Sequence, residues 1–423
     1  MNAIVEQHKK SRYKWEVLLL LWVAYLLNQA DRQVFNVVLP LIREDLGLTD
    51  VAIGTIATIF NLFYAVLVPV AGFIGDRYSR KWIVTFAVLF WSVATMCTGL
   101  ANGFLMLILM RSMATGGGEA FFGPPNYSLL AQYHGSKTRA TAMSIHQTAY
   151  YIGIILSGYV AGYVGQVWGW RAAFYVFGAV GVVHGIIMAV RLKDKKEPEK
   201  KEKEPAKEKI TFTQGFRVVF TTPTALMLTL CFSGLIFVLT GYLTWMPTYL
   251  YETFNMSLAN AGFSSMFYTH IFAFIGILIA GKLSDKLGAK NPSRRMMMQG
   301  AGLLLAVPFI VMMGNSTVLW VIYIGFAGFG FSRAFFDANT YTVLYDVIPP
   351  KYHSSASGVM IMTGFGVGAL APVILGVVKG SFGLSPGITM LAVVWLVCGI
   401  AMILGGKYFY MKDYKKIKHD SEL

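Results

Sequence analysis

Charged side chains are scarce in this sequence of 423 residues: they make up 13% of it, whereas soluble domains contain about a quarter. Hydrophobic residues make up 56%, so the chain has too little polar surface to cover a water-soluble fold. Apolar runs of roughly 20 residues, the length needed to cross a bilayer, recur along nearly the whole chain. The sequence therefore predicts an all-α integral membrane protein.

The sequence also lacks the residue sets that other functions require. Its cysteines, Cys97, Cys231 and Cys398, fall in separate apolar runs without metal-ligand spacing, so neither a metal site nor a disulfide framework is expected. A nucleotide-binding G-x-x-x-x-G-K-[ST] string is missing, which gives no support to ATP-driven transport. Since a nucleophile with its base is also missing, we expect neither an enzyme nor a cofactor.

Twelve apolar segments are predicted to span the membrane. In the first half they are Trp15–Leu39, Val51–Ile74, Trp82–Ala101, Phe104–Leu130, Ala142–Val167 and Ala172–Val190. In the second half they are Thr224–Leu250, Ala259–Ala280, Met296–Met313, Val318–Ile348, Ser355–Lys379 and Ile388–Tyr408.

The net charge of +15 could suggest a nucleic-acid partner, but the placement of the basic residues argues against one. They crowd alternate connections between the predicted spans, and the opposite connections contain only Arg43, Arg171 and Lys379. Cytoplasmic loops of membrane proteins carry such an excess of Lys and Arg. We therefore expect both termini in the cytoplasm, which requires an even number of spans.

The chain divides into two halves around the charged run KDKKEPEKKEKEPAKEK at 193–209, which has no apolar face. The expected domains are a cytoplasmic N-terminus (1–14), a six-helix bundle (15–192), a cytoplasmic linker (193–217), a second six-helix bundle (218–410) and a cytoplasmic tail (411–423).

A short motif occurs once in each half. GFIGDRYSRK (72–81) follows the second span and GKLSDKLGAK (281–290) follows the eighth. A duplicated six-helix unit predicts motifs at such corresponding positions. A simpler interpretation is that these charges only mark the cytoplasmic side, but it leaves the glycine and aspartate at fixed offsets unexplained.

These strings resemble the loop motif G-x-x-x-D-[RK]-x-G-[RK]-[RK] of the major facilitator superfamily. The resemblance implies twelve transmembrane helices in two pseudo-symmetric six-helix bundles that transport solutes by alternating access, and it implies a gate at this loop. The gating residues that it assigns are Gly72, Asp76, Arg77, Arg80, Gly281, Asp285 and Lys286; Ser79 stands where the family usually has glycine.

Three strings in the first half narrow the resemblance. They are LNQADR (27–32), Arg111 followed by GGEA (117–120), and WGWRAAF (168–174). They are similar to the anion:cation symporter branch, which includes hexuronate, galactonate and sialic acid permeases. The Spinster-like branch shares the first-helix and fourth-helix features, so both branches stay open.

Arg111 and Glu119 are eight residues apart, whereas the anion transporters usually place this pair seven apart. On an ideal helix the eight-residue spacing turns the two side chains about 80° from each other. A π-bulge accommodates one inserted residue and would bring the side chains of Arg111 and Glu119 back to the same face of the helix.

The charges that lie inside the predicted spans are candidates for function, because an unpaired charge at the centre of a membrane helix costs about 2.5–3.5 kcal/mol. We expect Asp31 and Glu119 to couple transport to protons, with Arg32 beside Asp31 keeping that carboxylate ionised and Arg111 tuning both acids. Arg333 and Asp337, four residues apart, are a candidate ion pair whose role is either structural or functional.

The sequence thus predicts a proton-coupled symporter that imports a small organic anion, in particular a sugar acid such as a hexuronate, aldonate or sialic acid. The alternatives are a Spinster-like carrier or exporter of lysolipids or other amphiphiles, and a neutral-sugar permease. We expect a monomer, in contact with membrane lipids, in the cell membrane, with the bacterial inner membrane as the favoured one. The substrate-binding candidates are Arg32, Arg111, Tyr64, Asn126, Gln147, Tyr151, Trp245 and Tyr341.

Overall fold

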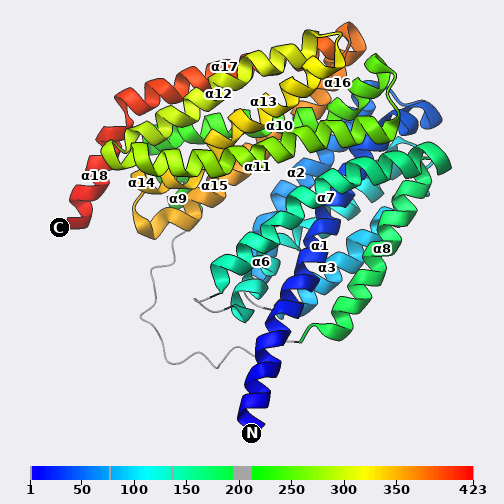
Figure 1. Ribbon diagram of the computed structural model, residues 1–423, viewed down its shortest axis with the longest axis horizontal. Helices are drawn as coiled ribbons and strands as arrows, with labels where there is room; N and C mark the ends of the chain where they lie inside the picture. The colour runs from blue at the N-terminus through cyan, green and yellow to red at the C-terminus, as the bar shows by residue number, and fades with distance from the viewer. Residues whose placement is uncertain (1, 76–77, 135–137, 194–211, 423) are drawn as a thin grey trace. The chain divides into compact units, whose positions relative to one another are not determined.

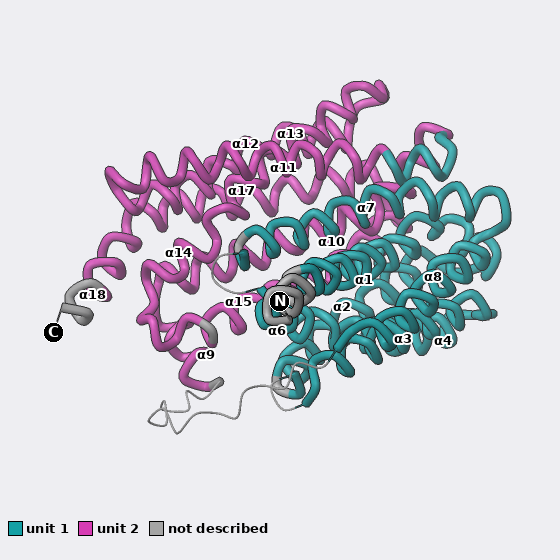
Figure 2. Tube along the Cα trace, turned by 60° about the horizontal axis from the view of Figure 1, so that its bottom comes forward, with its two compact units in different colours: residues 1–201, 256–263 teal, residues 202–255, 264–423 magenta. Residues whose placement is uncertain are grey.

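The structure is a computed structural model that describes residues 2–75, 78–134, 138–193 and 212–422. These residues form helices and their connections, without a β-strand in the described ranges. The chain separates into two compact units (Figure 2): unit 1 contains Met1–Lys201 and Met256–Phe263, and unit 2 contains Glu202–Asn255 and Ser264–Leu423.

Unit 1 is built from long helices with one interrupted span (Figure 1). Its elements are α1 (Asn2–Leu46), α2 (Asp50–Gly75), α3 (Arg80–Thr98), α4 (Phe104–Leu107), the π-helix η1 (Ile108–Thr115), α5 (Gly116–Ala120), α6 (Gly123–Tyr133), α7 (Arg139–Trp168) and α8 (Trp170–Arg191). Helix α1 packs along α7, α3 packs along α8, and η1 packs against both α2 and α3. The interrupted span is therefore held between two long helices.

Unit 2 contains α9 (Phe212–Thr221), α10 (Pro223–Phe254), α11 (Leu258–Lys290), α12 (Ser293–Asn315), α13 (Leu319–Asp337), α14 (Thr340–Val347), the 3₁₀ helix η2 (Pro350–Tyr352), α15 (His353–Gly368), α16 (Ala371–Phe382), α17 (Leu384–Tyr408) and α18 (Tyr410–Glu422). The first residues of α11, up to Phe263, group with unit 1. Helix α12 packs against α13 and α17, and α10 packs against α15 and α17.

All twelve predicted spans lie on helices, but three of them are not single rods. Residues 104–130 divide into α4, η1, α5 and α6; 318–348 divide into α13 and α14; and 355–379 divide into α15 and α16. Pro372 stands in the first turn of α16, and prolines also begin α6. Proline has no backbone N–H and is best tolerated in the first turn of a helix, so Pro372 and the prolines of α6 suit the start of a new helix at these two breaks.

Nine helices of the described part are long and apolar enough to cross a membrane by length and composition. The predicted spans at 15–39, 104–130 and 142–167 are not among them. Each of these three carries polar groups at depth: Asn28 to Arg32 in the first, Arg111 and Glu119 in the second, His146 and Gln147 in the third. Polar residues inside a membrane are costly and mark functional sites, and all three of these spans belong to unit 1.

One expectation about the connections needs correction. Residues 212–217 of the predicted linker (193–217) form the start of α9, and residues 194–211 lie outside the described ranges. The second copy of the repeated motif was expected in a loop, but α11 continues through it to Lys290. A helix breaker appears only after the motif, at Pro292.

Candidate functional site

The core of the candidate site is an ion pair between α1 and α5. Arg32 Nε donates a hydrogen bond to Glu119 Oε2 at 2.6 Å. The Glu119 side chain is fully buried and that of Arg32 is 17% exposed. Because solvent barely reaches this pair, its electrostatic interaction is far stronger than that of a surface ion pair.

Arg111 joins this pair from η1. Its Nη2 donates to the backbone carbonyl of Arg32 at 3.1 Å, and its guanidinium carbon lies 4.2 Å from the centroid of the Phe60 ring. The Arg32 guanidinium lies 4.0 Å from the centroid of the Tyr64 ring. Aromatic faces stabilise cations at such distances, so α2 supplies a ring to each arginine.

The predicted π-bulge between Arg111 and Glu119 is present. Residues 108–115 form the π-helix η1, and Thr115 Oγ1 donates to the Met110 carbonyl five residues earlier at 2.9 Å. The extra residue therefore lies inside a wider helical turn. Arg111 and Glu119 both reach Arg32, one through its carbonyl and the other through its side chain.

Glycines bring the neighbouring helices close to this segment. A Cβ atom on Gly116 would lie 2.9 Å from Phe60 Cδ2, and one on Gly118 would lie 2.8 Å from Phe90 Cδ1. Only a residue without a side chain allows α2 and α3 to approach α5 this closely. The short helix that carries Glu119 is therefore held on two sides.

Asp31 does not take the partner that its sequence neighbour suggests. Its Oδ2 accepts a hydrogen bond from Thr95 Oγ1 at 2.8 Å, while the Arg32 guanidinium bonds Glu119. Consecutive residues of a helix point about 100° apart, so Arg32 reaches α5 and Asp31 reaches α3. Arg32 is expected beside Asp31 from the sequence, but its side chain bonds Glu119.

Several buried polar atoms of this cluster have no hydrogen-bond partner among the described residues. They are Arg32 Nη2, Arg111 Nε and Nη1, Glu119 Oε1 and Asn28 Nδ2. Buried polar groups are normally paired, and leaving one unpaired costs about 1–3 kcal/mol. Three of the five atoms are guanidinium donors, which suit the oxygens of a carboxylate.

A second group of polar and aromatic side chains extends from α6 to α7. Asn126 Nδ2 lies 3.0 Å from His146 Nε2; since the amide nitrogen donates, this ring nitrogen accepts. The Tyr25 ring stacks on His146 with centroids 4.8 Å apart. Tyr127 OH donates to Gln147 Oε1 at 3.4 Å, and Tyr151 packs against Tyr150.

The remaining predicted binding residues belong to unit 2. Trp245 is fully buried and donates its indole N–H to the Pro372 carbonyl at 3.0 Å, which occupies its one hydrogen-bonding group. Tyr341 is 45% exposed and packs against Tyr345. Arg333 Nε donates to Asp337 Oδ2 at 3.0 Å, so this candidate pair does form within α13.

The predicted gating residues are only partly described. Asp76 and Arg77 lie outside the described ranges. Gly72 faces Pro124, 3.9 Å from the position of a Cβ atom, and Arg80 begins α3. In unit 2, Gly281, Asp285 and Lys286 lie on α11, and the side chains of Asp285 and Lys286 are exposed.

Thr95 and Phe60 were not predicted from the sequence. Thr95 is one of several threonines in an apolar helix, and Phe60 is one of many phenylalanines. Their partners follow from the packing of α1, α2, α3 and η1, and no local pattern in the sequence distinguishes them.

Comparison with known proteins places this geometry in context. Residues 21–372 match the model of the Major Facilitator Superfamily. A probable galactarate/D-glucarate transporter of Bacillus subtilis is 26% identical, with 90% of this chain and 89% of that protein covered. The hexuronate transporter of the same organism is 24% identical over 93% of this chain and 96% of that protein.

Spinster proteins are similar over comparable lengths. The protein spinster homolog 1 of Xenopus tropicalis is 24% identical, with 94% of this chain and 80% of that protein covered. A solved structure of a bacterial homolog of the human lysosomal transporter Spinster, inward-facing and unoccupied, has a TM-score of 0.83 at 23% identity; 95% of this chain and 98% of that one are covered. This likeness supports the fold of the chain.

Proposed function

Because the chain belongs to the Major Facilitator Superfamily, we propose that it is a proton-coupled symporter which imports a small organic anion of the sugar-acid class. The proposal is carried by one observation. Arg32 binds Glu119 through Nε, while buried guanidinium donors of Arg32 and Arg111 have no partner in the described part of the chain. The names of the sugar-acid relatives support the substrate class.

Charge balance indicates how a carboxylate enters this site. Asp31 and Glu119 oppose Arg32 and Arg111, so the four ionised groups sum to zero. A substrate carboxylate that binds Arg32 in place of Glu119 leaves the glutamate as a buried charge without its cation, which is strongly unfavourable. A proton on Glu119 removes that charge and frees Arg32.

Proton and substrate binding are coupled by this competition. Protonation of Glu119 releases the guanidinium of Arg32, and the substrate carboxylate takes its place with bidentate geometry. Loss of the proton restores the Arg32–Glu119 bond and displaces the substrate. Arg111 supplies two further donors, and Asp31, held by Thr95, is the second acid that we assign to proton coupling.

We call Asp31, Arg32, Arg111 and Glu119 the charged quartet. The rest of the substrate is assigned to the polar and aromatic group beside this quartet. Asn126, Gln147, Tyr64 and Tyr151 offer amide, hydroxyl and ring surfaces, which suit a polyhydroxylated carbon chain. Trp245 and Tyr341 of unit 2 stay candidates for substrate binding in their own right, and the indole N–H of Trp245 already bonds the Pro372 carbonyl.

Uptake into proteoliposomes tests the proposal. A panel of radiolabelled hexuronates, aldonates, aldarates and sialic acid is compared with neutral sugars and lysolipids, with and without an inward proton gradient. Accumulation of an acid only under the gradient supports the symporter. Gradient-independent uptake of a neutral sugar, or transport of lysolipids alone, contradicts it; the second result would favour the Spinster-like alternative that the relatives also suggest.

We further propose a multi-pass location in the cell membrane, with the bacterial inner membrane as the favoured one, a monomeric protein, and both termini in the cytoplasm. The distribution of basic residues over alternate connections supports this orientation. A tag at either end should react only from the cytoplasmic side. Labelling of either end from outside intact cells contradicts the orientation.

A further inference from the structure

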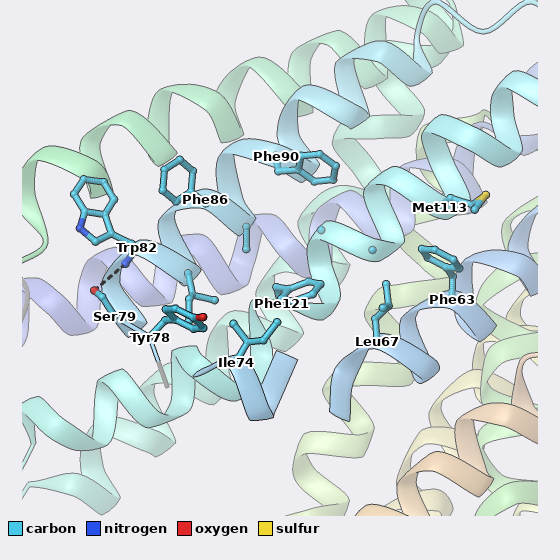
Figure 3. A pocket seen from close by; sticks show the side chains of 14 residues that line it. Phe63, Leu67, Ile74, Tyr78, Ser79, Trp82, Phe86, Phe90, Met113 and Phe121 are labelled. Carbon is cyan, nitrogen blue, oxygen red and sulfur yellow. Dashed lines mark hydrogen bonds between the residues drawn. The ribbon is translucent and has the colours of Figure 1, made fainter. Parts of the chain in front are cut away.

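Unit 1 contains an apolar cavity of about 730 Å³ between α2, α3 and the η1–α5 segment. Figure 3 shows Trp82, Phe86 and Phe90 along α3, Leu67 and Ile74 on α2, and Phe121 between the two rows. Its size is that of a cavity that takes up a small ligand. A polyhydroxylated anion finds almost no hydrogen-bonding groups there, so the ligand of this cavity is apolar.

One end of this cavity is aromatic, and Lys81, which is not itself a lining residue, lies beside it. The Lys81 ammonium lies 4.4 Å from the centroid of the Trp82 ring, and Trp82 is 44% exposed. Ser79 Oγ accepts a hydrogen bond from the backbone N–H of Trp82 at the start of α3. The neighbouring Tyr78 is 68% exposed. Tryptophan, tyrosine and lysine concentrate where a membrane meets water, so this end marks the headgroup level.

A cavity of about 530 Å³ occupies the corresponding place in unit 2, between α11, α12 and α13. Leu283 and Leu287 line it, and they follow Gly281 at the offsets at which Ile74 and Tyr78 follow Gly72. Both cavities are thus built on the repeated motif, although their other lining residues differ.

The second cavity also has a basic residue at the start of the next helix. Arg294, the second residue of α12, lines the cavity and is exposed. Lys81 is likewise the second residue of α3. A cationic group at the end of an apolar cavity complements a ligand with an anionic head and an apolar tail. The recurrence of this arrangement in both units favours a shared ligand.

We propose that each cavity binds an acyl chain of an anionic membrane phospholipid, with the phosphate at Lys81 in unit 1 and at Arg294 in unit 2. Charge complementarity selects this occupant, because anionic headgroups attract basic residues at the membrane surface by about 1 kcal/mol each. The proposal does not depend on the identity of the transported solute.

A bound chain in the first cavity would contact the segment that carries the ion pair. Gly117 and Gly118 line that cavity and directly precede Glu119. A Cβ atom on Gly117 would lie 3.3 Å from Phe63 Cε1. The lipid therefore packs against the backbone of α5, and it stabilises the turn from which Glu119 projects.

The test uses the full chain in phosphatidylcholine nanodiscs that contain a small fraction of lipid with a photoactivatable acyl chain. The probe is phosphatidylglycerol in one sample and phosphatidylcholine in the other, and labelled peptides are mapped by mass spectrometry. We expect about fivefold more labelling of Phe86, Phe90 and Leu305 by the phosphatidylglycerol probe than by the phosphatidylcholine probe. This factor corresponds to a difference of about 1 kcal/mol in binding free energy. Equal labelling by both headgroups overturns the proposal.

Charge variants assign the headgroup. Lys81→Gln should lower labelling in the first cavity about fivefold and leave the second unchanged, and Arg294→Gln should do the reverse. The matched control is Lys14→Gln, because Lys14 also lies over an exposed tryptophan, Trp15, at 5.6 Å. Trp15 lines neither cavity, whereas Trp82, under Lys81, lines the first. An equal loss in the control variant contradicts specific headgroup binding.

A steric variant tests the cavity without changing charge. Ala301 lines the second cavity and is exposed, so Ala301→Trp can fill the space without forcing a buried side chain aside. We expect labelling of Leu305 to be lost and labelling of Phe86 to persist, in a protein with an unchanged thermal transition. Persistent labelling of Leu305 in this variant places the lipid outside the cavity.

Discussion

Arg32 and Glu119 are 87 residues apart in the chain, and their side chains are joined at 2.6 Å in the interior of unit 1. The proposed exchange mechanism assigns this bond two exclusive states, closed on the glutamate or open for a substrate carboxylate.

Glu119→Gln removes the proton-dependent charge and keeps the shape of the side chain. We expect the variant to bind substrate and exchange it across the membrane, because Arg32 no longer has an anionic competitor. Accumulation driven by a pH gradient should be lost, since no proton is released with the substrate. Exchange and gradient-driven uptake are measured on the same proteoliposomes.

Glu16→Gln is the matched control for this change, because Glu16 pairs with Arg191 at the surface of unit 1. It should retain gradient-driven uptake. A Glu119→Gln protein that still concentrates substrate would move the coupling role to Asp31, and Asp31→Asn would then be tested in the same two assays.

Arg32→Lys keeps the positive charge but removes the planar guanidinium group, whose paired N–H donors bind a carboxylate with two hydrogen bonds. A charged hydrogen bond contributes about 1.5–3 kcal/mol, so we expect substrate affinity to fall about 10- to 100-fold. Binding is measured as protection against thermal unfolding over a range of substrate concentrations. Arg43→Lys is the control, because Arg43 of α1 pairs with Asp50 at the start of α2; this variant should bind substrate normally. Unchanged affinity in Arg32→Lys would place the anion at Arg111.

Gly118→Ala should destabilise unit 1, because the added Cβ would lie 2.8 Å from Phe90 Cδ1 and 3.0 Å from Trp91 Cβ. Overpacking of this kind costs about 1–3 kcal/mol, which should appear as a lower apparent melting temperature in detergent. Gly103→Ala is the control, since its backbone is extended and nothing lies within 4 Å of the new atom. Equal melting temperatures for both variants would show that α3 can move away from α5.

Asp45 ties the end of α1 to the start of α8. Its Oδ2 accepts hydrogen bonds from Arg171 Nη1 at 2.5 Å and from Trp170 Nε1 at 3.1 Å. The bond from Arg171, followed by that from Trp170, lowers the pKa of Asp45 below its ordinary value of 3.8. A lowered folded-state pKa stabilises the protein above the unfolded-state pKa, and this contribution is lost as the pH falls through the folded-state pKa.

Asp45→Asn should therefore reduce the apparent melting temperature slightly at neutral pH, since the side chains of Asp45 and Arg171 are 46% and 39% exposed and water screens the pair. The difference from the unmodified protein should be complete well above pH 3.8 and should shrink as the pH falls below 3.8, through the lowered pKa of Asp45. Glu44→Gln, at an exposed neighbour, should change nothing. A difference that stays constant through acid pH would mean that packing, and not charge, explains the loss.

The membrane spans and several details of the site could be predicted because local features of the sequence determine them. Apolar length indicates the spans, Pro124 and Pro125 suit the start of α6, and the eight-residue spacing of Arg111 and Glu119 is one that a wider turn accommodates. Each of these follows from a few neighbouring residues.

The pairing of charges could not be predicted in this way, because it depends on the rotation of α1 relative to α3 and α5. Arg32 is next to Asp31 in the sequence, yet it bonds Glu119, and Asp31 bonds Thr95. The helical course of the second motif copy was also missed. Gly281 and Gly288 match a loop motif, but isolated glycines cost a helix only about 1 kcal/mol each, and α11 continues through both of them.

The balance of two acids and two arginines has a consequence for the electrical work of transport. If one proton enters with each monocarboxylate, the proposed exchange at Arg32 moves no net charge, and a membrane voltage neither drives nor opposes it. A dicarboxylate with one proton carries a net negative charge, which a potential of 100 mV, negative inside, would oppose by about 2.3 kcal/mol. The voltage dependence of uptake therefore distinguishes aldonates or hexuronates from aldarates as the solute to which this quartet is matched.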